Sequence, residues 1–170
     1  MVWKSKVPLK VKVFVWSVAL KRINTNDMSQ RRRPNRRLLP QWCIVCRLDA
    51  ESIDHLFLHC QGARFLWQRL FLLAGVCWVS PASSLDMLVI HYGCFGKSKR
   101  GVVLWRCAVL VVFWVLWLEK NSRIFEDRVV EFGKIWDGEF FLASLWASVT
   151  KEFNVVPLFV IMSNWKAICG

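Results

Sequence analysis

The chain has 170 residues, 55% of them apolar, and a formal net charge of +12. This length and composition exclude an intrinsically disordered chain and suit a folded core that needs no disulfide bonds. Residues 1–40 contain eleven Lys or Arg residues and one acid, a net charge of +10, so the basic surplus lies in the N-terminal part. Such a segment would attract phosphate backbones or anionic lipids. The alternative is a solvated basic surface without a partner.

The first helix is predicted over residues 9–23, after Pro8, which suits a helix start. Thr25 is a good N-cap for a short second helix. The apolar face of the first helix recurs at spacings of three and four residues and consists of Val13, Trp16, Leu20 and Ile23.

Residues 30–40, QRRRPNRRLLP, are predicted to form a loop or short arm, because Pro34 and Pro40 exclude a regular helix. The arginines of this arm must point into solvent or at an anion. They are Arg31, Arg32, Arg33, Arg36 and Arg37.

The rest of the chain is predicted to be mainly helical, with Gly75 as a helix stop. Residues 155–162, VVPLFVIM, are a β-prone apolar run whose structure the pattern leaves open. The predicted helices cover residues 61–76, 84–91, 102–125 and 131–152.

The apolar run at residues 102–118 predicts a buried helix rather than a membrane span. It contains Arg106, and a span needs about 20 apolar residues. A secretory signal peptide is not expected, because Lys10 and Lys12 interrupt the N-terminal apolar run. We therefore expect an intracellular protein, in the nucleus or cytoplasm, whose seven cysteines stay reduced.

Residues 43–60, CIVCRLDAESIDHLFLHC, contain three cysteines and two histidines within a short segment. A Cys-x2-Cys pair such as Cys43 and Cys46 places two thiolates at adjacent corners of a tetrahedron. Zinc closes a structural site with four sulfur or imidazole ligands, so a zinc site is favoured over a redox pair or over free thiols. His55 would be the third ligand.

The fourth ligand could be Cys60 or His59, since both a Cys3His and a Cys2His2 set are known for zinc. On one straight α-helix, His55 and Cys60 would point about 140° apart and could not face one ion. A Cys60 ligand therefore requires a helix break near residues 58–60.

Several short stretches within residues 3 to 71 fit one pattern together. They are Trp3, VPLKVKVFVW at 7–16, RINTND at 22–27, the Cys43 to Cys46 pair, ESIDHLFLHC at 51–60, and Trp67, with a looser match in WVLWLEKNSRIF at 114–125. In these stretches the chain resembles the zinc-binding domain that follows the reverse transcriptase in plant LINE-type (non-LTR) retrotransposons, and plant proteins derived from them. Lys120 stands where the looser pattern carries Arg.

The resemblance implies a ligand set of Cys43, Cys46, His55 and Cys60, and moves His59 to second place. It also implies that residues 1–40 pack as helices beside the site. Glu51 belongs to the matched motif, and we expect it to start a helix or make a hydrogen bond near the zinc knuckle, or to contact His55. The expected fold is mainly α: a small helical zinc-knuckle domain (Cys3His) over residues 1–74, a linker over 75–101 and a long-helix, Trp-rich C-terminal extension over 102–170.

Enzyme activity is not expected from this sequence. It contains no Asp-Asp pair, so the metal-binding palm motif of polymerases is absent, and a zinc ion with four protein ligands has no open position. A small-molecule substrate is likewise not expected.

Two functions remain open. One is a nucleic-acid-binding module for RNA or single-stranded DNA, in which the five arginines neutralise phosphates and Trp42 stacks on an unpaired base rather than packing on the zinc loop. The other is a structural or protein-interaction zinc domain with a hydrophobic partner on the C-terminal helices, including a degenerate retroelement fragment with no independent function.

Overall fold

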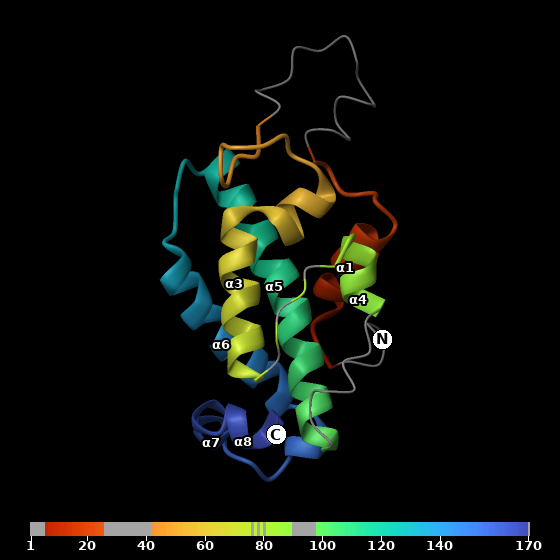
Figure 1. Ribbon diagram of the computed structural model, residues 1–170. Helices are drawn as coiled ribbons and strands as arrows, with labels where there is room; N and C mark the ends of the chain where they lie inside the picture. Colours follow the sequence, from red (N-terminus) through yellow and green to blue (C-terminus); the bar gives the residue numbers. More distant parts are fainter. Residues whose placement is uncertain are drawn as a thin grey trace.

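The computed structural model describes residues 6–25, 42–75, 77, 79, 81–89 and 98–169. Within these residues the regular elements are helices, and the extended pairing is the isolated antiparallel bridge between Trp42 and Ala50. The mainly α fold class is therefore confirmed (Figure 1). The elements are α1 (Leu9–Ala19), the π-helix η2 (His55–His59), α3 (Gln61–Leu73), α4 (Ser84–Val89), α5 (Lys99–Phe125), α6 (Phe132–Ser148), the 3-10 helix η3 (Lys151–Phe153), α7 (Leu158–Ser163) and α8 (Trp165–Cys169).

Helix α5 is the central element, and α1, α3 and α6 pack along it (Figure 1). The Ser98 side chain caps its first turn by accepting a hydrogen bond from the Gly101 N–H at 3.0 Å. Its long apolar run is buried, as predicted, because other helices cover most of its circumference. Phe113 of α5 lies 5.1 Å from the Phe57 ring and 5.8 Å from the Trp67 ring, which ties α5 to the segment that carries the cysteine and histidine cluster.

The helix α1 is confirmed, but its predicted apolar face is wrong at three of four positions: Val13, Trp16 and Leu20 are exposed, while Ile23, beyond the helix end, is buried. The buried residues are Val11, Val15 and Val18, whereas Val13 and Trp16 are 50% and 47% exposed. Both sets recur at helical spacing, so the sequence pattern could not choose between them. The valine face fits because small β-branched side chains allow close approach to α5 and α4.

The other predicted helices are confirmed in position. Gly75 follows the end of α3 with φ of +70°, the left-handed conformation that glycine adopts at helix ends. The β-prone run at residues 155–162 contains the start of α7, which begins directly after Pro157, a residue with its φ already set for a helix start. The arginine arm and the second helix predicted after Thr25 lie outside the described residues.

By length and composition, α5 could cross a membrane. However, 67% of its most apolar window is buried against the rest of the protein, as in a core helix. The division into residues 1–74, 75–101 and 102–170 stays a prediction. Helices from the first and last of these segments nevertheless share one buried core.

Candidate metal centre

The first half of the site is a tight turn that carries Cys43 and Cys46. The N–H of Arg47 donates to the Cys43 carbonyl at 2.8 Å, and the N–H of Cys43 donates to the Asp49 carbonyl at 2.7 Å. Arg47 has φ of +58°, a left-handed conformation that reverses the chain after the second cysteine. The Trp42 to Ala50 bridge closes the base of this loop, so both thiols project from one side.

The second half comes from η2 and the residue after it. The His55 N–H donates to the Ser52 hydroxyl at 3.1 Å, which starts the helical turn. The Cys60 N–H donates to the His55 carbonyl five residues earlier at 2.6 Å, the hydrogen bond of a π-helix. Cys60 itself is non-helical, with ψ of 141°, and α3 begins at Gln61.

The predicted helix break near residues 58–60 is thus confirmed, and the structure adds how the chain achieves it. In a π-helix five residues complete roughly one turn, so His55 and Cys60 lie one above the other instead of on divergent faces. A widened turn of this kind commonly marks a functional site.

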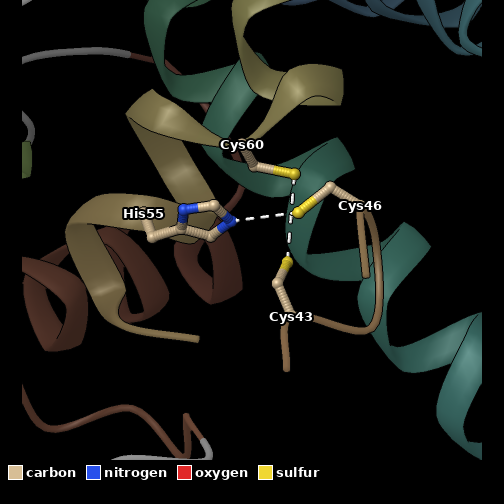
Figure 2. A group of neighbouring side chains, drawn as sticks. All are labelled: Cys43, Cys46, His55 and Cys60. Carbon is tan, nitrogen blue, oxygen red and sulfur yellow. Dashed lines mark hydrogen bonds between the residues drawn. The ribbon is translucent and has the colours of Figure 1, made fainter. Parts of the chain in front are cut away.

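The four donor atoms of Cys43, Cys46, His55 and Cys60 all lie within 4.8 Å of one another (Figure 2). The Cys43 and Cys60 sulfurs are 3.9 Å apart, and the Cys46 sulfur is 3.2 Å from His55 Nε2. In a zinc tetrahedron with Zn–S bonds of about 2.3 Å, neighbouring sulfurs are about 3.8 Å apart. These residues are therefore placed to hold a zinc ion, whereas His59 is not part of the group.

Protonation of the two buried thiols is strongly coupled. The hydrogen bond with Cys60 lowers the pKa of the Cys43 thiol, while the same contact and burial raise the pKa of Cys60 well above its usual range. The contact therefore favours a proton shared by the two sulfurs. Zinc binds cysteines as thiolates, so loading the site would release that proton.

On the other ring nitrogen of His55, the Asp49 carboxylate lies 4.0 Å from Nδ1. At this distance the carboxylate makes no direct hydrogen bond to the ring, and its effect on Nδ1 is electrostatic.

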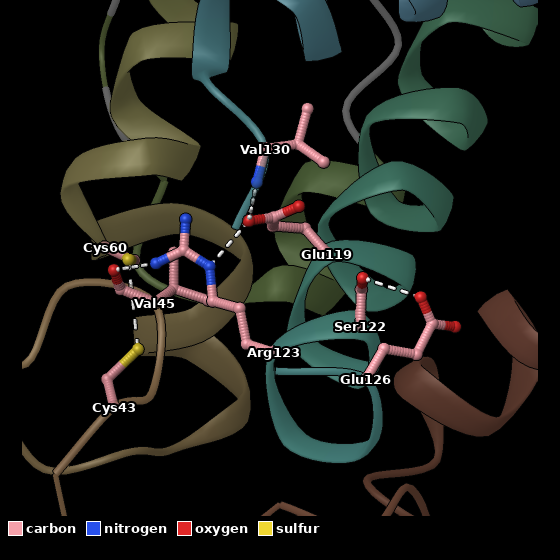
Figure 3. A network of polar contacts seen from close by, with 8 residues as sticks. All are labelled: Cys43, Val45, Cys60, Glu119, Ser122, Arg123, Glu126 and Val130. Atoms are coloured by element: carbon pink, nitrogen blue, oxygen red, sulfur yellow. Dashed lines mark hydrogen bonds and ion pairs between the residues drawn. The ribbon is translucent and has the colours of Figure 1, made fainter. Parts of the chain in front are cut away.

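The end of α5 supports the Cys43 to Cys46 turn directly (Figure 3). Arg123 donates through one terminal nitrogen to the Val45 carbonyl at 2.7 Å, and through Nε to the Glu119 carboxylate at 2.6 Å. Glu119 also accepts the Val130 N–H at 3.2 Å, so its carboxylate is held from two sides. This network fixes the guanidinium that in turn orients the cysteine loop.

A second contact joins α5 to the residues just before η2. Lys120 and Glu51 form an ion pair whose side chains are 2% and 0% exposed, and Lys120 also donates to the Asn24 carbonyl at 3.1 Å. Glu51 is thus a hydrogen-bond partner near the knuckle, one of the roles expected for it. Its ion-pair partner, Lys120, belongs to the looser motif at residues 114–125.

Sequence reasoning missed Lys120, Arg123 and a third supporting contact, in which the Trp67 ring N–H donates to the Phe57 carbonyl of η2 at 2.7 Å. Two of the three lie in the motif that resembled the family only loosely, and Trp67 ends the specific one. Those matches were the available signal.

Trp42 is 56% exposed at the edge of the knuckle rather than packed beneath it. A hollow of about 390 Å³ lies beside the metal centre and is lined by Trp42, Cys43, Ile44 and Arg47. The predicted phosphate-binding arginines at residues 31–37 lie outside the described residues, so the structure places one of the predicted nucleic-acid residues, Trp42.

Comparison with known proteins points to the same chemistry. Residues 1–67 match a family described as zinc-binding in reverse transcriptase. The chain is also 25% identical, over 146 residues, to a candidate ribonuclease H protein of Arabidopsis thaliana; the match covers 83% of this chain and 23% of that protein. No solved structure matches the chain. The predicted resemblance and the predicted zinc cofactor are confirmed.

Proposed function

We propose that this chain, whose first 67 residues match the zinc-binding domain of reverse transcriptases, is a zinc-stabilised module that binds RNA or single-stranded DNA and has no polymerase activity. The matched family describes the zinc-binding domain and not the polymerase. We further propose that it acts inside the cell, in the nucleus or cytoplasm, where its metal-binding thiols stay reduced.

The observation that carries this proposal is the exposed indole of Trp42 beside the metal centre. The hollow that it lines also contains the side chain of Arg47, which is exposed. An aromatic face next to a cation suits an unpaired base with its phosphate, since bases stack on aromatic rings and phosphates pair with arginine. Metal binding would fix the loop that presents both groups.

Charge supports the same function. Residues 1–40 carry a net charge of +10, in the segment that leads directly to Trp42. A cationic segment next to a stacking residue is the usual arrangement of proteins that follow a single strand.

The proposal also excludes enzyme activity for this chain. Four protein ligands fill the coordination sphere of zinc, so no position remains for water or substrate. The ribonuclease H name belongs to a relative of which this chain matches 23%, and the spacing of the acids along the sequence does not indicate a four-carboxylate nuclease site.

Fluorescence anisotropy with labelled single-stranded RNA and DNA, at increasing salt, tests the proposal on the zinc-loaded chain. Affinity should fall steeply with salt, and Trp42→Ala should weaken binding by about fivefold to 100-fold, the range for one stacked base. Trp16→Ala is the matched control, because Trp16 is 47% exposed on α1. Equal affinities of the two variants, or no binding tighter than about 10⁻⁴ M, would reject the proposal.

A structural or protein-interaction zinc domain, including a degenerate fragment without independent function, is the second candidate. An exposed apolar stripe on α1 favours it: Leu9, Val13, Trp16 and Leu20 are between 44% and 68% exposed. The hydrophobic partner predicted for the C-terminal helices also stays a proposal. If this candidate holds, Trp16→Glu changes the association state in sedimentation velocity, while Trp42→Ala changes nothing.

A further inference from the structure

A second cavity lies on the N-terminal half of α5, away from the metal centre. Its volume is about 310 Å³, within the range of small-ligand sites, and three basic side chains line it: Lys6, Arg106 and Lys151. We propose that this cavity binds the phosphate group of a nucleotide, either free or within a single-stranded nucleic acid.

The three cations come from separate parts of the chain. Lys6 precedes α1, Arg106 lies in α5, and Lys151 begins η3. Convergence of three like charges on one cavity costs free energy unless an anion offsets it. Among the described residues, no carboxylate oxygen lies within 4.0 Å of any of these three cations, so none of them is held in an ion pair.

The wall that carries Lys151 is held in place by α5. Arg100 donates through Nε to the Glu152 carbonyl at 2.8 Å, and its guanidinium lies 5.8 Å from the centre of the buried Phe153 ring. The Thr150 hydroxyl donates to the Ala147 carbonyl at 2.7 Å. Lys151 is therefore presented on a backbone segment that is held in place, as a preformed binding site requires.

The rest of the lining includes one thiol and one carboxylate. Burial raises the pKa of the Cys107 thiol to about 12, so this side chain stays neutral beside the cations. The Glu152 side chain also lines the cavity. A carboxylate there repels a bare phosphate but accepts a hydrogen bond from a hydroxyl, so the lining favours a nucleotide, whose ribose supplies that donor.

The cavity and the metal centre are separate sites. Arg106 lies seventeen residues before Arg123, which contacts the cysteine turn, so about 26 Å of helix axis lies between them. A mononucleotide cannot reach both. A strand of several nucleotides can, which would deepen the function proposed above, but the cavity stands on its own contacts.

Isothermal titration calorimetry on the zinc-loaded full chain tests the proposal with uridine monophosphate, inorganic phosphate and a single-stranded oligouridylate. Arg106→Gln and Lys151→Gln should each weaken uridine monophosphate binding by about tenfold, the effect of losing one charged hydrogen bond. Lys166→Gln on α8, whose lysine is exposed, is the control and should bind like the unchanged chain.

Glu152→Gln should change phosphate affinity in the opposite direction, which a loss of structure would not do. Removing the carboxylate should tighten inorganic phosphate binding at least threefold, because it removes a repulsion next to the anion. If only the oligonucleotide shows dependence on Arg106, the phosphate comes from a nucleic acid; if the mononucleotide does, a free nucleotide suffices. If no probe binds more weakly to Arg106→Gln than to Lys166→Gln, the proposal is wrong.

Failure of this site and failure of the function proposed above give different results. Trp42→Ala should leave uridine monophosphate binding unchanged whether or not it weakens oligonucleotide binding. If the single substitution Trp42→Ala abolishes binding of uridine monophosphate, the phosphate site has been placed wrongly.

Discussion

The guanidinium of Arg123, in the last turn of α5, donates a 2.7 Å hydrogen bond to the carbonyl oxygen of Val45, between the two cysteines of the metal-binding turn. The cysteine turn and the end of the long helix are thus one structural unit, although 78 residues separate the two partners. Metal binding should therefore depend on residues that never touch the metal.

Arg123→Gln should weaken zinc binding by about tenfold to 100-fold, since it removes the donor that orients the Val45 carbonyl. Competition with a colorimetric chelator measures this affinity. Arg128→Gln is the matched control, because Arg128 forms an exposed ion pair with Glu126 at 3.8 Å. Equal zinc affinities of the two variants would show that α5 does not support the site.

Lys120→Met should lower the free energy of unfolding by about 3–5 kcal/mol, because it leaves the buried Glu51 carboxylate without its ion-pair partner. The double variant Lys120→Met with Glu51→Leu should recover most of this loss, since both charges are then gone. Urea unfolding of the zinc-loaded proteins measures both values. Losses that simply add in the double variant would mean that the pair is not coupled.

Gly62→Ala should destabilise the protein by about 1–3 kcal/mol, since overpacking forces neighbours to move. A Cβ atom at Gly62 would lie 2.0 Å from the Phe132 ring at the start of α6. Gly133→Ala is the control: a Cβ there meets nothing within 4 Å, and alanine in a helix should stabilise by up to about 1 kcal/mol. Opposite signs in thermal unfolding are expected, and two equal shifts would contradict the packing.

Glu139 should make stability fall as pH rises. Its carboxyl is buried, and one oxygen has no hydrogen-bond partner among the described residues. Burial raises the folded-state pKa well above the usual value, so above the unfolded-state pKa the unfolded chain binds fewer protons than the folded one. The loss continues until the folded-state pKa is passed, with a slope of at most about 1.4 kcal/mol per pH unit.

Glu139→Gln isolates this effect, because the metal ligands also titrate and remain in both proteins. Urea unfolding from about pH 5 to about pH 8 should show the difference in stability between variant and unchanged chain growing with pH. A difference in stability that stays constant over this pH range would show that burial does not raise the pKa of Glu139 in the folded protein.

The sequence was sufficient for the positions of α1, α3, α4, α5 and α6 and, once Cys60 is taken as a ligand, for the break before it. Both follow from local rules: helical spacing of apolar residues, and the angle between two ligands on one helix. The π-helix His55–His59 that leads to this break was not predictable, because its extra residue leaves no mark in a periodic pattern.

The parts that could not be predicted depend on contacts between distant residues. Two apolar stripes interleave on α1, and only packing against α5 and α4 decides that Val11 is buried and Trp16 exposed. Likewise, in the sequence alone Lys120 and Arg123 look like ordinary charged residues near the end of a helix. Their roles become visible when the fold brings them to Glu51 and Val45.

Zinc stoichiometry of the purified chain and two variants tests the metal centre itself. We expect one zinc per chain, its loss from Cys60→Ser, and its retention in His59→Ala, because Cys60 lies in the group of four donors and His59 does not. Retention of zinc by Cys60→Ser together with its loss from His59→Ala would contradict this metal centre.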